Sequence, residues 1–71
     1  MKYVINNKVK LLRTSLEISQ EKLADIVDVT RLSIISIEKQ RYEPSVGLAI
    51  RLAKALNSTV EELFWIEKEE E

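Results

Sequence analysis

Cysteine and histidine are both absent from this 71-residue sequence, and glycine and proline occur once each. Without cysteine or histidine the chain has no disulfides, no thiolate or imidazole catalysts and no zinc sites built on these ligands. The single glycine excludes a glycine-rich phosphate loop. Glu61 and Glu62 form a carboxylate pair, but no metal-ligand set converges with them. We therefore expect neither an enzyme nor a bound cofactor or metal.

Long apolar runs are also missing. No stretch approaches the roughly 18 residues of a membrane span, and the start, MKYVINNKVK, lacks the apolar core of a signal peptide. With 45% hydrophobic and 32% charged residues, the chain has the composition of one soluble globular domain. We expect it in the cytoplasm, away from membranes. A chain this short buries only about 60% of its unfolded surface, so a partner chain would add stability.

The net charge of −1 hides an uneven distribution. The last five residues, EKEEE, contain four acids and one base, so we divide the chain into a single domain at 1–66 and an acidic tail at 67–71. Between Arg31 and Lys54 five residues are basic and two are acidic, which gives this stretch a net charge of +3. Segregated charge of this kind is a better guide to an anionic partner than the overall sum.

Apolar spacing predicts five short helices joined by tight turns. The first follows Asn6-Asn7, and the third should end near Lys39-Gln40, because Pro44 cannot sit inside a helix. The other four helices are expected to begin after good N-terminal caps, at Ser19, Thr30, Ser45 and Thr59. The inward faces of the first three helices should carry Val9, Leu12, Leu16, Leu23, Ala24, Val27, Ile34 and Ile37.

The two ends of the chain are candidate strands. KYVI at 2–5 is short and β-branched, and FWIEK at 64–68 is rich in apolar residues. Each is too short to be stable alone, so they would have to pair, within one chain or between two chains. The alternative is two frayed termini.

The second and third helices have the features of a helix-turn-helix. The turn at Asp28-Val29 is so short that the helices must cross at a large angle, and the small Ala24 lets the third helix pass close by. Ile34 and Ile37 anchor the third helix from behind. Its outer side is then free to enter a DNA major groove, which is about 12 Å wide.

At these residues the sequence resembles the phage-repressor-like helix-turn-helix family, of the Cro and repressor or xenobiotic-response-element type. The resemblance covers about residues 7–66 and includes the five-helix layout, RYEPS at 41–45 and the closing VEELF. The matching single residues are Gln20, Leu23, Ala24, Ile34, Ile37 and Glu38. It looks most like a compact subgroup of bacterial and archaeal regulators that dimerise and pair their terminal segments as strands. The resemblance implies an all-α, five-helix repressor-like domain with a helix-turn-helix. The N- and C-terminal segments could add a short β-ribbon to it.

Some positions depart from the family pattern. Glycine is common in the family at the positions of Glu17, Asp28 and Gln40, where helices end in a left-handed turn. Asp28 adopts that conformation at small cost, whereas Glu17 and Gln40 would each cost about 1 kcal/mol or more. Leu16 lies where the family is usually polar, which makes it a candidate contact surface.

The resemblance implies two kinds of DNA contact. Bases would be read from the outer face of the third helix, by Arg31, Leu32, Ile35 and Ser36. Phosphates would be held by Gln20, Lys39, Arg41, Tyr42 and Ser45, where Ser45 opens a helix whose free N–H groups suit an anion. The alternatives are a solvated glutamine and an ordinary solvated loop, with Tyr42 packed beneath it.

The proposed base-reading side chains have different chemistry. Arg31 can form a bidentate bond with guanine, and Ser36 can bond a base edge or a phosphate. Leu32 and Ile35 can only pack on thymine methyl groups. Exposed apolar side chains are costly in a free monomer and useful in a groove. The alternative for Leu32 and Ile35 is burial in the core through a slightly rotated helix.

Two structural features complete the expectations. The resemblance implies an ion pair between Arg13 and Glu38 that orients the third helix. The C-terminal segment also has more apolar residues than one short helix needs, so some should fill the core and the rest form a two-fold interface. That predicted interface comprises Val60, Leu63, Phe64, Trp65 and Ile66. The alternative is that all of them belong to the core.

These expectations describe a homodimeric, sequence-specific DNA-binding transcriptional regulator. It would bind double-stranded DNA through the major groove of an inverted-repeat operator, as a repressor rather than an activator, and we infer no small-molecule ligand. The alternative is a protein-interaction module of the same fold that has lost DNA binding, with an antitoxin-like or scaffold role. The low net charge and the apolar Leu32 and Ile35 favour that alternative.

Overall fold

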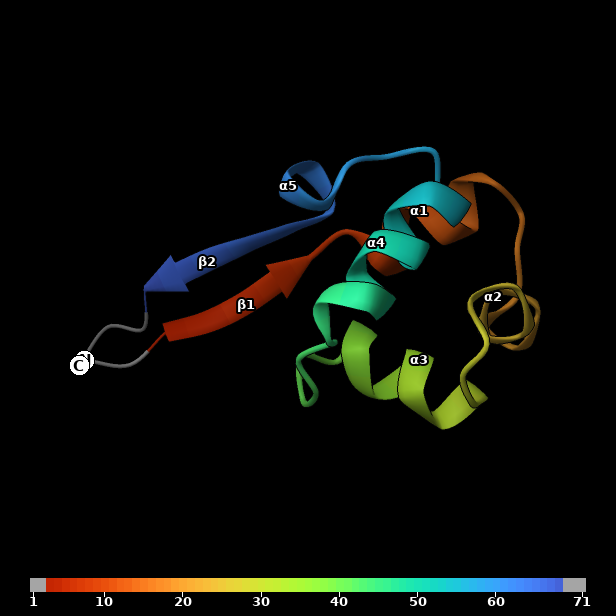
Figure 1. Cartoon of the computed structure of the whole chain (residues 1–71), viewed down its shortest axis with the longest axis horizontal. Helices are drawn as coiled ribbons and strands as arrows, with labels where there is room; N and C mark the ends of the chain where they lie inside the picture. Colours follow the sequence, from red (N-terminus) through yellow and green to blue (C-terminus); the bar gives the residue numbers. More distant parts are fainter. Residues whose placement is uncertain (1–2, 69–71) are drawn as a thin grey trace.

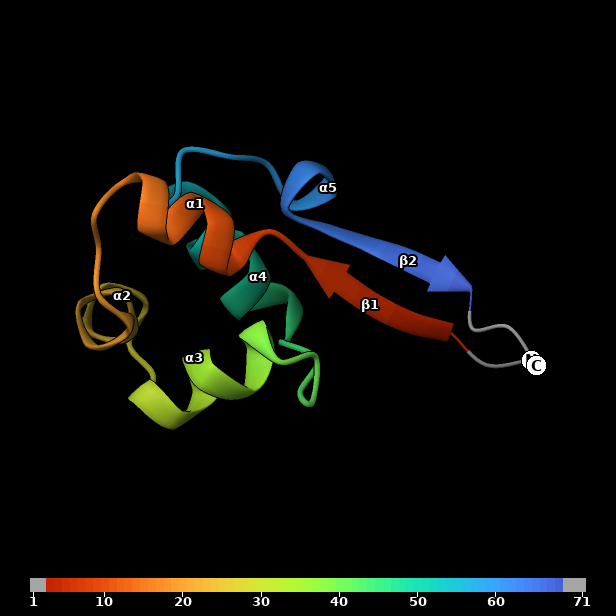
Figure 2. The ribbon, with the colours of Figure 1, turned by 180° about the vertical axis from the view of Figure 1, so that it is seen from behind.

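The computed structural model describes residues 3–68, as five helices and a two-stranded antiparallel sheet. The helices pack together at one end of the molecule, and the two strands form a ribbon that projects from them (Figure 1). The view from behind shows the same separation (Figure 2). Because of the ribbon, the molecule measures 37 Å along its longest axis and 22 and 21 Å along the others.

The five helices are α1 (Val9–Ser15), α2 (Gln20–Val27), α3 (Arg31–Glu38), α4 (Val46–Ala55) and α5 (Val60–Leu63). The predicted five-helix fold is therefore confirmed. In α2 to α5 the side chain of the cap accepts a bond from the backbone N–H three residues on, as predicted for Ser19, Thr30, Ser45 and Thr59. Such caps contribute about 1 kcal/mol each.

Four residues that are not glycine have left-handed backbone conformations, and each closes a helix. They are Glu17, Asp28, Gln40 and Asn57, with φ between 56° and 63°. After each one, the next residue donates its N–H to the carbonyl five residues back: Ile18 to Arg13, Val29 to Ala24, Arg41 to Ser36 and Ser58 to Ala53. This bond defines the Schellman ending. The left-handed turns of the family pattern are therefore present at Glu17, Asp28 and Gln40 although the chain lacks glycine there, and Asn57 makes a fourth.

The ribbon consists of β1 (Tyr3–Asn7) and β2 (Phe64–Lys68). Tyr3 lies opposite Lys68 and Asn7 opposite Phe64, so the termini pair within one chain. The frayed-termini alternative is wrong for the described residues. The candidate strand at 64–68 is confirmed as β2, and β1 continues past the predicted end at Ile5 to Asn7. Phe64, the last residue of VEELF, belongs to β2, so α5 ends at Leu63.

The predicted acidic tail begins inside the ribbon. Glu67 and Lys68 belong to β2, where the Glu67 carboxylate accepts a bond from Asn6 Nδ2 at 3.0 Å. Residue 2 of the predicted first strand and residues 69–71 of the predicted tail lie outside the described residues.

One continuous core joins all five helices. Its buried members are Val9, Leu23, Ala24, Val27, Ile34, Ile37, Leu48, Leu52, Ala53, Leu56 and Leu63. The inward faces predicted for α2 and α3 are confirmed. Leu16 was wrongly placed on the inward face of the first helix: it follows the last helical turn and is exposed. Within residues 3–68, no helix has the length and apolar character needed to cross a membrane.

We predict that Glu17→Gly raises the free energy of unfolding by about 0.5–1 kcal/mol. Glycine removes the Cβ strain of the left-handed conformation, and this gain exceeds the entropy that glycine loses on folding. Chemical denaturation measures the change. Glu17→Ala is the matched control, because alanine keeps the Cβ and should give no gain. Equal effects of the two substitutions would contradict this account.

Candidate nucleic-acid interface

The helix-turn-helix is built from α2, α3 and the turn between them. Asp28 supplies the left-handed residue, with φ 63° and ψ 51°, and Val29 packs against the core from the turn. Arg51 of α4 donates from Nε to the Val27 carbonyl at 3.0 Å, so α4 also holds the end of α2. The left-handed Asp28, the core contact of Val29 and the Arg51 bond from α4 therefore fix the turn through which the chain enters α3 at Thr30. Arg51 was not identified from the sequence, where it was only one charge in a basic stretch.

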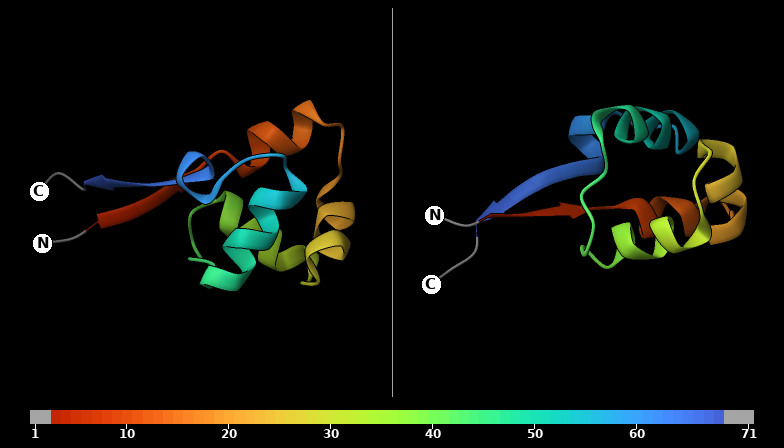
Figure 3. Two further views of the ribbon diagram at one scale, coloured as in Figure 1. Left: turned by 45° about the horizontal axis from the view of Figure 1, so that its top comes forward. Right: turned by 60° about the horizontal axis from the view of Figure 1, so that its bottom comes forward.

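The outer face of α3 lies at the edge of the molecule. In Figures 1 and 2 no other element runs beneath this helix, and the right-hand view of Figure 3 agrees. Ile34 and Ile37 are 0% and 1% exposed, whereas Leu32 is 73% exposed. The core-burial alternative is therefore wrong for Leu32. Ile35 is half-buried, so it offers only part of its surface to a partner.

A shallow hollow on this face joins α3 to the loop that follows it. It is lined by Leu32, Ser33, Ser36, Arg41 and Tyr42. The structure thus brings two of the predicted base-reading residues next to two of the predicted phosphate contacts. Ser33 was missed, although it lies three residues before Ser36 and hence on the same side of the helix. Tyr42 is 47% exposed and is not packed beneath the loop.

A second, polar hollow lies at the N-terminal end of α2. It is lined by Arg13, Ser19, Gln20, Glu21 and Arg31. Gln20 and Arg31 were assigned to phosphate and to base contact respectively, and they flank one another here. An anion at this hollow would meet the Arg31 guanidinium and the N-terminus of α2 together.

The two remaining predicted phosphate contacts are separate from these hollows. Lys39 caps α3 and is exposed. Ser45 is exposed at the start of α4, and its hydroxyl accepts a bond from the Leu48 N–H at 3.2 Å. The hydroxyl oxygen is therefore occupied as a cap, and the Ser45 hydroxyl proton remains for another partner.

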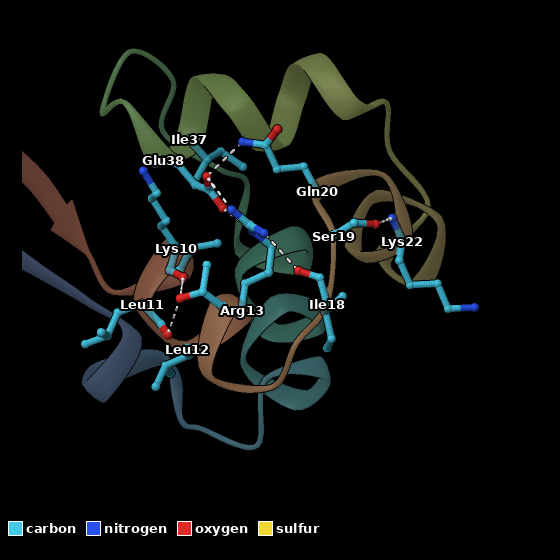
Figure 4. Close-up of polar contacts among 12 residues, drawn as sticks. Lys10, Leu11, Leu12, Arg13, Ile18, Ser19, Gln20, Lys22, Ile37 and Glu38 are labelled. Carbon is cyan, nitrogen blue, oxygen red and sulfur yellow. Dashed lines mark hydrogen bonds and ion pairs between the residues drawn. The ribbon is translucent and has the colours of Figure 1, made fainter.

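The C-terminal end of α3 is held by a buried ion pair. Arg13 Nε donates to Glu38 Oε2 at 2.7 Å, and the two side chains are 10% and 4% exposed. Gln20 Nε2 donates to Glu38 Oε1 at 3.0 Å, and Arg13 Nη1 donates to the Ile18 carbonyl at 2.8 Å. Figure 4 shows Arg13 from α1 and Gln20 from α2 both reaching Glu38. The network fixes α3 against two other helices.

The predicted dimer-interface residues divide into three groups. Leu63 is 0% exposed, so its assignment to an interface is wrong: the side chain fills the core. Val60 and Phe64 are half-buried and line an apolar hollow with Ile5, Pro44, Val46 and Ala49. Trp65 and Ile66 are 37% and 65% exposed.

The strand register shows that Trp65 and Ile66 point to opposite faces of the ribbon. Ile66 lies opposite Ile5, whereas Trp65 lies opposite Asn6. Since successive residues of a strand point to opposite faces, Trp65 and Ile66 cannot belong to one flat surface. Two apolar residues of α4 that were not predicted as contacts are also exposed: Val46 by 77% and Ile50 by 43%. Their spacing of four residues on one helix face was the available signal.

The fold and this interface define a helix-turn-helix protein. The helix-turn-helix family model matches residues 9–63, and the chain belongs to this family. It is 46% identical over 65 residues to the HTH-type transcriptional regulator YgzD of Bacillus subtilis, and this alignment covers 92% of this chain and 98% of YgzD. It is 39% identical over 66 residues to the HTH-type transcriptional regulator MJ0272 of Methanocaldococcus jannaschii, with 93% of this chain and 100% of that one covered.

Two solved structures have the same fold. The restriction-modification controller protein C.AhdI from Aeromonas hydrophila superposes with a TM-score of 0.75 at 32% identity, over 80% of this chain and 86% of that one. The clp gene regulator ClgR from Corynebacterium glutamicum superposes with a TM-score of 0.70 at 23% identity. That match covers 73% of this chain and 55% of ClgR, and it supports only the assignment of the fold.

We predict that Glu38→Ala lowers the free energy of unfolding by about 3 kcal/mol, because it leaves the Arg13 guanidinium buried without its partner. Urea denaturation followed by circular dichroism measures the loss. Glu21→Ala is the control: it removes an exposed carboxylate close to the same network and should change stability by less than about 0.5 kcal/mol. A loss below about 1 kcal/mol for Glu38→Ala would mean that the pair is not effectively desolvated.

Proposed function

We propose that this protein is a sequence-specific DNA-binding transcriptional regulator that acts as a homodimer. The single observation that carries the proposal is the contrast between the two sides of α3: Ile34 and Ile37 are buried, while Leu32 is exposed on the opposite side. A helix anchored from behind in this way can be laid in a major groove, with Arg31, Leu32, Ile35 and Ser36 facing base edges.

Phosphate contacts would flank the base-reading helix. Gln20 and Arg31 share the hollow at the start of α2, and Arg41 and Tyr42 share the hollow at the end of α3. Lys39 and the N-terminus of α4 at Ser45 complete this set. Contacts on both sides of α3 would fix its register on the duplex, while sequence would be read by the helix itself.

A second copy of the chain would cover the apolar surface that α4 and β2 leave exposed. Val46 and Ile50 of α4, together with Phe64 and Ile66 of β2, are the residues we assign to this interface. To enter two successive major grooves, the two copies of α3 would have to lie about 34 Å apart, one turn of duplex, and a two-fold axis between them would make the operator an inverted repeat.

Repression is the favoured mode of action, because blocking a promoter requires only occupancy of the operator. The named relatives in Bacillus subtilis and Methanocaldococcus jannaschii are HTH-type transcriptional regulators, and C.AhdI is a controller protein. These similarities support a role in transcriptional control.

Binding to duplex DNA from upstream of the protein's own gene should be tight and steeply dependent on salt. With six or more phosphate contacts in the dimer, the affinity should fall about a thousandfold between 50 and 200 mM salt. Fluorescence anisotropy measures it. Arg41→Ala should weaken specific and non-specific binding alike, whereas Glu61→Ala, on α5 and outside both hollows, should change neither. A folded dimer that binds no duplex at 50 mM salt would remove the proposal.

Leu32 should read a thymine methyl group. Replacing each operator thymine in turn with deoxyuridine removes only that methyl, so at one position per half-site the affinity should fall about fivefold or more. Leu32→Ala should lose a similar factor on the thymine duplex and almost nothing on the matching deoxyuridine duplex. Ile26→Ala, at an exposed apolar residue of α2, is the matched control. Additive losses from Leu32→Ala and the base change would contradict this contact.

The second candidate function is a protein-interaction module that has lost DNA binding. It is favoured by the 73% exposure of Leu32 and by the net charge of −1. The combined substitution of Arg31 and Arg41 by alanine separates the two. It would abolish DNA binding under the first function and leave capture of a protein partner intact under the second.

A further inference from the structure

Asn7 lies where three elements meet. It ends β1, it precedes α1, and its side chain reaches the end of α3. Its Oδ1 accepts the Val9 N–H at 3.0 Å, and its Nδ2 donates to the Ile37 carbonyl at 3.0 Å. A backbone N–H can only donate and a carbonyl can only accept, so these partners fix which end of the amide is oxygen. Both ends of the half-buried side chain are therefore used.

A second side chain links the same two elements in the opposite direction. Gln40, the left-handed residue after α3, donates from Nε2 to the Ile5 carbonyl of β1 at 3.4 Å. Its backbone N–H bonds to the Ile37 carbonyl at 3.0 Å, the same oxygen that Asn7 reaches. The Ile37 carbonyl belongs to the last turn of α3, where no N–H of the helix is left to satisfy it. The ribbon thus completes the end of the proposed base-reading helix.

We propose that Asn7 is a positioning residue for DNA recognition, which holds the last turn of α3 against the ribbon. If a second copy docked on Ile66 and moved the ribbon, the Asn7 bond to the Ile37 carbonyl would change the tilt of α3. The effect on DNA rests on the proposed function. Arg13 and Gln20 hold the neighbouring Glu38 from α1 and α2, and Asn7 adds a link from the ribbon that is shorter than the Gln40 bond to the Ile5 carbonyl.

The competing explanation is that Asn7 only caps the start of α1. Asn7→Ser separates the two roles, because serine keeps an oxygen that can accept the Val9 N–H but has no amide donor that reaches the Ile37 carbonyl. Asn6→Ser is the matched control. It makes the same change on the neighbouring residue, whose Nδ2 bonds Glu67 on the ribbon and not α3. Asn6 Oδ1 also accepts the Asn7 N–H at 2.7 Å, and serine keeps an oxygen that can accept this bond.

The first measurement compares affinities for the operator and for a scrambled duplex at one salt concentration. We expect Asn7→Ser to bind the operator about tenfold more weakly, because one buried hydrogen bond is lost and its acceptor is left with a single partner. Binding to the scrambled duplex should stay within twofold, and Asn6→Ser should stay within twofold on both. Operator affinity within twofold for Asn7→Ser, or an equal loss on both duplexes, would overturn the proposal.

The second measurement needs no DNA. Backbone amide chemical shifts of residues 38–41 in the free protein should change in Asn7→Ser and remain unchanged in Asn6→Ser. If the wild-type protein binds no duplex, the proposed function fails, and these shifts still decide whether the ribbon and α3 are coupled. Unchanged shifts at residues 38–41 in Asn7→Ser would overturn the coupling itself.

Discussion

The end of α3 depends on one buried carboxylate. Glu38 receives hydrogen bonds from Arg13 and Gln20, so α1 and α2 are both tied to the last turn of this helix. A carboxylate on a side chain that is only 4% exposed is stable only with such partners. Because hydrogen bonds depend on angle as well as distance, the network also restricts the orientation of α3. It fixes the orientation of α3 more sharply than apolar packing of Ile34 and Ile37 alone would.

The rest of the domain makes this orientation possible with few residues. Left-handed endings after α1, α2, α3 and α4 let each helix stop and the chain reverse within a short turn. Non-glycine residues pay a conformational cost in all four. The core is correspondingly small, and apolar side chains on α4 and the ribbon remain exposed. In the proposed homodimer a second copy would bury them, so dimerisation would stabilise the fold as well as pair two copies of α3.

Much of this structure was predictable, for reasons visible in particular residues. Ser19, Thr30, Ser45 and Thr59 marked the helix starts because a cap needs a short oxygen-bearing side chain. The buried and exposed faces of α3 were predictable from the helical spacing of its apolar residues. Other features depend on three-dimensional packing. The burial of Leu63 and the link from Asn7 to Ile37 depend on segments far apart in sequence, and local pattern carries no information about them.

The central claim is that the outward side of α3 touches bases. Nuclear Overhauser effects between methyl-labelled protein and operator duplex test this claim most directly, because they require protons within a few ångströms of one another. The account predicts contacts from the Leu32 methyl groups to a thymine methyl or neighbouring major-groove protons, and none from the exposed Val46 of α4. Contacts from Val46 with none from Leu32 would contradict it.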